Sequence, residues 1–193
     1  YTKTQIDGQF STVNQQISQL NAELSVQAGE IATKVSRTEF ESLRIGGRNL
    51  LRNSHIMKNT NGGIIGYPFD KSLFILDEDI TVSFDARTSE SGVTGYLDSY
   101  FRHSSAGIQP FSPVFQVTND WKRYSYTIKV TQEHIDSTET ISFRSSASVA
   151  GNTTGVKVDI KNVKIERGNR ATDWTPAPED VQGQIDGLGT RVS

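Results

Sequence analysis

The sequence predicts an all-β fold: an antiparallel jelly-roll β-sandwich, flanked at both ends by α-helical coiled-coil segments. Three observations predict it. Apolar residues at both ends of the chain follow a heptad spacing, the central residues alternate between polar and apolar, and turn-forming residues separate the alternating stretches. We therefore expect a coiled-coil helix over residues 1–44, a sandwich domain over 45–177, and an exit linker that leads into a second coiled coil over 178–193.

The first segment places apolar residues in alternating steps of four and three. One heptad position holds Phe10, Ile17, Leu24 and Ile31, and the other holds Ile6, Val13, Leu20 and Gln27. The flanking residues are mostly Gln, Ser, Asn and Thr, so only this narrow seam can be buried, which favours partner helices. β-branched residues at both positions favour three strands, and hence a homotrimer. The alternative is a single amphipathic helix that packs on its own domain.

The other end of the chain repeats this pattern. Val181, Ile185, Leu188 and Val192 are spaced four, three and four residues apart, and the tetrapeptide Gln-Ile-Asp-Gly at 5–8 recurs at 184–187. A segment repeated on both sides of a domain predicts a string of coil, domain and coil.

The central part of the chain predicts short strands. Polar and apolar residues alternate over 81–87, 93–103, 123–130, 140–144, 156–160 and 163–165. Turn signals lie at 61–63, 91–92, 118–120 and 151–155. About eight strands without a helical pattern between them predict a two-sheet antiparallel sandwich.

Composition narrows the classes of function. The chain has 193 residues, a formal net charge of −2 and no cysteine, and its mean hydropathy is −0.47. We therefore expect no nucleic-acid or membrane partner, no thiol chemistry and no cysteine-ligated metal. Three scattered histidines make a histidine metal site unexpected.

Catalysis also finds little support in the sequence. No nucleophile elbow, phosphate-binding loop or metalloprotease helix occurs. Asp85 and Asp98 would form a glycosidase pair only if their strands adjoin. We predict a non-enzyme without a cofactor, and note Asp159 as a candidate ligand for a structural calcium ion.

The strand over 93–103 carries the main candidate site. Tyr96, Asp98, Tyr100 and Arg102 share one face of it, opposite Leu97 and Phe101. Aromatic rings pack on the C–H face of a sugar, and Asp and Arg bond its hydroxyls, so this row predicts a carbohydrate-binding groove. Arg144, on the polar face of another strand, extends the groove if the two strands adjoin. The alternative is that the tyrosines cover a sheet edge or pack under a loop, with solvated charges between them.

Further candidates come from outside this row. Tyr67, His103 and Phe111 are expected in loops near a ligand. Trp121 follows the Asn119-Asp120 turn, and the sequence favours core packing at the end of the sandwich for it over ligand binding.

Two segments carry a resemblance to a known family. They are Gly-Gly-Arg-Asn-Leu-Leu-Arg-Asn-Ser at 46–54 and Ile-Glu-Arg-Gly-Asn-Arg-Ala-Thr-Asp-Trp-Thr-Pro-Ala-Pro-Glu-Asp at 165–180. Together they resemble the motifs that bracket carbohydrate-binding-module-like domains in tail, baseplate and receptor-binding proteins of phages of Gram-positive bacteria, particularly streptococci and lactic acid bacteria. The Asn-Asp-Trp-Lys-Arg-Tyr stretch at 119–124 also looks like a strand start of such domains.

The resemblance implies a location and partners. It implies a jelly-roll module at the tail tip or baseplate of a virion, carried on an oligomeric protein beside other tail proteins, that attaches to host cell-surface polysaccharide. Some relatives use the module only as a spacer, so a structural spacer or oligomerisation segment without a ligand is the alternative function. Neither motif supplies ligand-binding residues, and the Tyr96 row rests on strand alternation alone.

Overall fold

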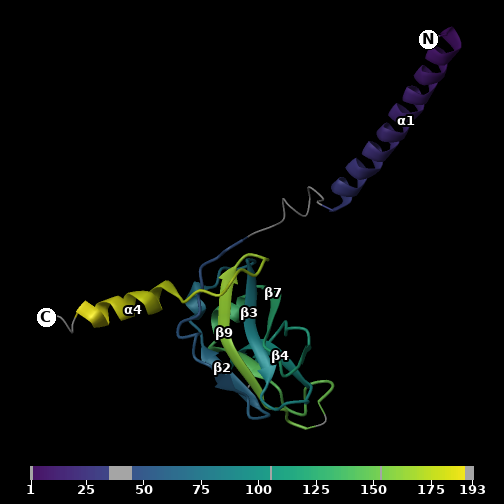
Figure 1. Cartoon of the computed structure of the whole chain (residues 1–193). Helices are drawn as coiled ribbons and strands as arrows, with labels where there is room; N and C mark the ends of the chain where they lie inside the picture. Colours follow the sequence, from purple (N-terminus) through teal and green to yellow (C-terminus); the bar gives the residue numbers. More distant parts are fainter. Residues whose placement is uncertain (1, 35–44, 105, 153, 190–193) are drawn as a thin grey trace. The chain divides into compact units, whose positions relative to one another are not determined.

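The computed structural model describes residues 2–34, 45–104, 106–152 and 154–189. The chain divides into two compact units, residues 1–43 and 44–193. Helix α1 (Lys3–Lys34) belongs to the first, and a two-sheet β-sandwich belongs to the second (Figure 1).

Helix α1 leaves its apolar seam uncovered in the single chain. Thr2 and Gln5 cap its start reciprocally, with the Thr2 amide donating to Gln5 Oε1 at 2.9 Å. Six seam side chains are half to two-thirds exposed: Ile6, Phe10, Val13, Ile17, Leu20 and Leu24. A helix of this length, rich in Ser, Asn and Thr, draws its stability mainly from burying such a stripe.

The sandwich consists of two antiparallel sheets. The first has the strand order β1 (Lys58–Asn59), β9 (Val158–Arg167), β3 (Asp79–Thr88) and β7 (Lys122–Lys129). The second has the order β2 (Ile64–Pro68), β8 (Thr140–Arg144), β4 (Gly95–His103) and β5 (Ala106–Ile108), and β6 (Phe115–Val117) also pairs with β4. This confirms the predicted mostly-β, two-sheet sandwich.

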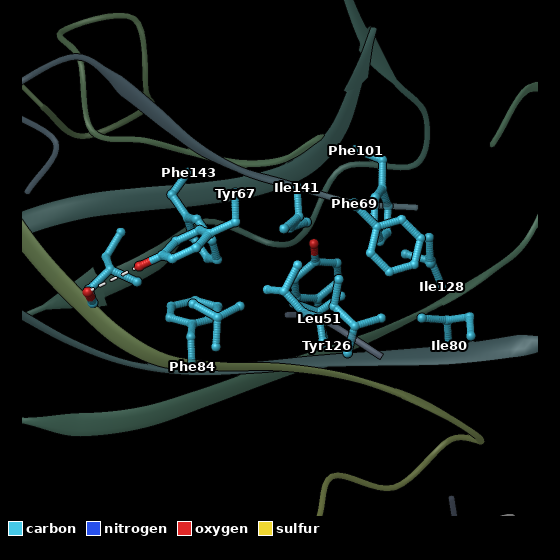
Figure 2. Packing of buried hydrophobic residues seen from close by; sticks show 14 of the residues in the cluster. Leu51, Tyr67, Phe69, Ile80, Phe84, Phe101, Tyr126, Ile128, Ile141 and Phe143 are labelled. Carbon is cyan, nitrogen blue, oxygen red and sulfur yellow. Dashed lines mark hydrogen bonds between the residues drawn. The ribbon is translucent and has the colours of Figure 1, made fainter. Parts of the chain in front are cut away.

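The core lies between the two sheets. Figure 2 shows Phe101, Ile141 and Phe143 of the second sheet facing Ile80 and Phe84 of the first. The rings of Phe84 and Phe143 pack edge to face, with centroids 4.8 Å apart. Alternate residues of β3, β4, β7 and β8 point into this layer, so the residues between them point outward from the sandwich.

The alternation of polar and apolar residues predicted the positions of the long strands, but it predicted one of them as two separate strands. The predicted stretches 156–160 and 163–165, apart from residues 156 and 157, lie in the single strand β9, which is irregular where it pairs with β3 between Ser83 and Asp85. Asn162 takes a positive φ of 51° at this point, as the extra residue of a bulge does. The short strands β1, β2, β5 and β6, the 3-10 turn η1 (Lys71–Leu73) and helix α3 (Gln132–Ser137) carried no predicted pattern.

Asn49 joins the opening segment of the domain to its closing segment. The side chain is fully buried, and its Nδ2 donates to Ser54 Oγ at 3.0 Å and to the Thr175 carbonyl at 2.9 Å. Its Oδ1 accepts from the amides of Leu51 and Ile165. These bonds explain the asparagine in the opening motif, because no apolar side chain can satisfy the same buried backbone groups.

A buried ion pair completes this junction. We call Gly47, Lys164, Glu166, Thr172 and Asp173 the closing clasp. Lys164 and Glu166 are 1% and 0% exposed, and their charged atoms lie 3.6 Å apart. Glu166 also accepts from the amides of Gly47 and Thr172, at 2.9 and 2.8 Å, and Lys164 donates to the Asp173 carbonyl at 2.8 Å. The two motifs found in the sequence therefore build one structural element.

The exit from the sandwich departs from the sequence prediction in one respect. Gly168 turns the chain out of β9 with a φ of 97°, and the Trp174 indole donates to Ser54 Oγ at 3.2 Å. No linker precedes the helix in the predicted range 178–193, because helix α4 (Pro178–Gly189) begins at Pro178. Proline suits this first position of a helix, where its missing N–H has no partner to lose.

His134 is the buried residue of α3, and its burial predicts acid sensitivity. Its Nδ1 accepts from the Thr131 amide at 3.2 Å, and the ring lies against Phe74 and Phe101. Burial lowers the pKa of His134. The unfolded chain therefore takes up a proton below its ordinary pKa of about 6.5 while the folded chain resists it, so stability falls as the pH drops below that value.

Urea denaturation at pH 7.5 and pH 5 tests this expectation. The wild-type midpoint should fall more between the two pH values than that of His134→Gln, which cannot gain a charge. Equal falls in the two proteins would show that His134 does not contribute.

Candidate functional site

The predicted row on β4 lies on the outer face of the second sheet, beside β8. Asp98 lies directly opposite Arg144, and Tyr100 opposite Ser142. Arg144 donates to both carboxylate oxygens of Asp98, with Nε 3.1 Å from Oδ1. Hydrogen bonding to Asp98 raises the pKa of Arg144. The predicted neighbourhood of Arg144 and the β4 row is thus present, and its two charges satisfy each other.

An aromatic pair lies next to this ion pair. The rings of Tyr100 and Phe111, which we call the stacked pair, have centroids 4.6 Å apart and planes inclined by 23°. The Arg144 guanidinium carbon is 5.5 Å from the Tyr100 ring centroid and 5.9 Å from that of Phe111. Tyr100 is only 5% exposed, whereas Phe111 is half-buried. Of the two rings, that of Phe111 is therefore the more accessible.

The loop between β5 and β6 holds Phe111 in this place. Ser112 exchanges two hydrogen bonds with the backbone of Ser99, both of 2.8 Å. At Gly107, a Cβ atom would come within 2.6 Å of Phe111 and 2.8 Å of Tyr100. The stacked pair thus depends on a residue without a side chain at position 107.

The remaining members of the row differ in exposure. Tyr96 is half-buried under the loop before β9, where Gly151 lies against its ring and Asn152 bonds its backbone N–H and C=O, both at 2.9 Å. Arg102 is half-buried at the other end of the row. Burial raises the pKa of Tyr100, so its hydroxyl stays neutral and can both donate and accept.

Tyr67 and His103 lie apart from the stacked pair. Tyr67 was expected in a loop but lies in β2 and points into the core, 2% exposed, with its hydroxyl donating to the Ile56 carbonyl at 2.9 Å. Burial there raises its pKa. His103 ends β4 on the surface, and its Nδ1 is 3.1 Å from a carboxylate oxygen of Glu139.

Trp121 lies on the outer face of the first sheet. The core packing favoured for it is wrong, because the ring is half-exposed between two cations: Lys161 Nζ lies 4.1 Å and the Arg87 guanidinium carbon 4.8 Å from its centroid. Arg87 and Lys161 attract the electron-rich faces of the indole, which holds the ring at the surface.

Asp159 is surrounded by hydrogen-bond donors instead of calcium ligands. Its carboxylate accepts from Asn59 Nδ2 at 2.7 Å, Ser89 Oγ at 3.0 Å and Arg87 Nε at 3.2 Å. The cation paired with Asp159 is the Arg87 guanidinium, and this pairing removes the basis for a calcium ion at Asp159. Within residues 2–34, 45–104, 106–152 and 154–189, no three acidic or histidine side chains gather as a metal site would require.

The glycosidase pair and membrane-spanning helices are the two remaining features to compare with the structure. Asp85 lies on β3 of the first sheet and Asp98 on β4 of the second, so their strands do not adjoin. Among the described helices, none combines the length and apolar character needed to cross a membrane.

Comparisons with known proteins give likeness of fold at low identity. No family model matches the sequence, and no curated protein matches it. Among solved structures, the tripod from the baseplate of bacteriophage Tuc2009 matches with 14% identity and a TM-score of 0.44, over 72% of this chain and 61% of that one. The CBM22-2 xylan-binding domain from Paenibacillus barcinonensis Xyn10C matches with 13% identity and a TM-score of 0.40, over 66% of this chain and 96% of that one.

The CBM22-1 xylan-binding domain of the same protein matches with 12% identity and a TM-score of 0.39, over 59% of this chain and 70% of that one. The structural neighbours thus include a phage baseplate tripod and carbohydrate-binding modules. At these values no ligand or partner of these proteins is transferred to this chain, and the aligned part is less than two thirds of the tripod chain.

Proposed function

We propose that the chain is a non-enzymatic adhesion segment that binds polysaccharide on the outer face of the β4–β8 sheet. The stacked pair beside the Asp98–Arg144 ion pair is the observation that carries the proposal. Phe111 offers an apolar ring to the C–H face of a sugar. The Arg144 guanidinium lies next to it and can donate to the hydroxyls of that sugar, while Asp98 holds the guanidinium in place.

The proposal extends to the assembly. Three α1 helices bury their seams against one another, and the sandwich of each chain then presents one sugar site. Weak binding at each site becomes firm attachment when several sites engage the same surface. The resemblance of the opening and closing motifs to phage tail domains supports a location at the tail tip or baseplate, and host cell-wall polysaccharide of Gram-positive bacteria as the ligand.

Phe111→Ala tests the site. We expect at least about tenfold weaker binding to wall polysaccharide, because the variant loses the stacking ring. Isothermal titration with polysaccharide extracted from streptococci and lactic acid bacteria measures it. Phe111→Tyr keeps the ring and should keep the affinity.

Trp121→Ala is the matched control, since it removes a half-exposed aromatic ring from the outer face of the other sheet. Unchanged urea midpoints of all variants show that the fold is intact. If Trp121→Ala loses binding and Phe111→Ala does not, the proposed face is wrong.

A structural spacer without a ligand is the second candidate function. It is favoured because other parts of the chain already cover the tyrosines of the β4 row. Tyr100 lies under Phe111 and Tyr96 under the loop at Gly151, so both tyrosines already have intramolecular partners. If the wild-type chain binds none of the wall polysaccharides, the spacer is the better account.

A further inference from the structure

A concave site lies at the edge of the sandwich, and neither residue of the stacked pair lines it. It is a cavity of about 560 Å³, within the range of small-ligand sites. We call it the edge cavity; its lining comes from the opening motif, from β1 and β2, and from the turn into η1. The residues that line it are Leu50, Arg52, Asn53, Ile56, Lys58, Tyr67, Pro68, Phe69, Asp70 and Leu73.

Two cations belong to this lining. Lys58 is half-buried, with its ammonium 4.3 Å from the centroid of the Tyr67 ring and 2.5 Å from the Gly66 carbonyl that it bonds. Burial lowers the pKa of Lys58, which means that its charge has lost part of its hydration. Arg52 is exposed and forms no hydrogen bond with another residue that the structure describes. Within the described part of the chain neither cation forms a salt bridge, and an anion in the cavity would supply one.

Asp70 is the acidic residue of the lining. One of its oxygens accepts from the Ser72 amide at 3.0 Å, as the cap of η1. The hydrogen bonds from Ser72 lower the pKa of Asp70, and the charge of Arg52 adds to the effect. Its side chain is exposed, so it can accept from the hydroxyl groups of a ligand.

The rest of the lining is apolar. Pro68 and Ile56 are exposed and Leu73 is half-buried, so they offer C–H surface to a ring or carbon chain. The ligand that fits has an anionic group, hydroxyls and an apolar face. We propose that the edge cavity binds an acidic saccharide or polyol unit that carries a carboxylate or a phosphate ester, at a site separate from the stacked pair.

Titration of the full chain by amide NMR at fixed ionic strength tests this proposal. Glucuronate and glycerol 3-phosphate are the two anionic probes and separate the carboxylate from the phosphate source, while glucose is the neutral control. We expect saturable shifts at Arg52, Lys58 and Asp70 with at least one anion and none with glucose. Arg52→Ala and Lys58→Met should each weaken binding about tenfold, the effect of one charged hydrogen bond.

Two matched variants keep the result specific. Lys122→Ala removes an exposed cation on β7 and should leave the affinity unchanged. Phe111→Ala should also leave it unchanged, so that failure of one site is distinguishable from failure of the other. The proposal is overturned if neither anion gives saturable shifts, if glucose shifts the same amides equally, or if Lys122→Ala weakens binding as much as Arg52→Ala.

Discussion

Glu166→Ala is expected to destabilise the sandwich by about 3–5 kcal/mol, because it strands the Lys164 ammonium in a site without solvent. The amides of Gly47 and Thr172 lose their acceptor in the same variant. Domains are usually stable by only about 5–15 kcal/mol, so much of the folded population should be lost. Urea denaturation followed by tryptophan fluorescence measures the change, since Trp174 lies on the same exit segment.

Lys129→Ala is the control for charge loss. Lys129 pairs with Asp79 at 3.2 Å on the surface, and its side chain is 61% exposed. Such pairs contribute about 0–1 kcal/mol. A double variant, Lys164→Met with Glu166→Leu, should recover part of the loss, because it leaves no unpaired charge. If Glu166→Ala costs no more than Lys129→Ala, the clasp is not a major source of stability.

Ile17→Asp in α1 is expected to convert a trimer of the full chain into monomers. Ile17 lies in the middle of the seam and is 52% exposed in the single chain. A carboxylate at each of three facing positions would repel its neighbours and would have to be buried without a partner. The unpaired helix should then lose much of its helicity, since isolated helices of this composition are marginal. Multi-angle light scattering and far-UV circular dichroism measure the two effects.

Gln15→Asp adds the same charge opposite the seam and should leave the mass of a trimer unchanged. A wild-type chain that stays monomeric over the accessible concentrations would contradict the role proposed for the seam. A dimer or tetramer would contradict the choice of three strands from its β-branched residues.

The long strands were predictable because their two faces differ. β3, β4, β7 and β8 each place one side chain in the core and the next outside, and this alternation is written in the sequence. β2 was missed because Ile64, Ile65 and Pro68 break the pattern, and β1 is too short to have one. β9 looked like two strands because the bulge at Asn162 shifts its alternation by one residue.

The candidate site was predictable only in part. Strand alternation placed Asp98 and Tyr100 on one face, and the pairing of β4 with β8 brought Arg144 beside them. Alternation carries no information about a loop that returns over the sheet, so packing of the tyrosines under a loop was only the alternative, and Phe111 was not predicted to cover Tyr100. The only local signal was Gly107, whose missing side chain leaves room for both rings.

The closing clasp also determines how the domain would carry tension along a chain of coils and domains. Ile45 and Gly168 pair in antiparallel orientation, so the polypeptide enters and leaves the sandwich at the same place. A pull on the two ends would apply tension to this junction first and would break its hydrogen bonds one after another. The strands beyond Asn49 and Ile165 would bear no tension until the junction opened. A ligand bound to those strands would therefore not be strained by the pull.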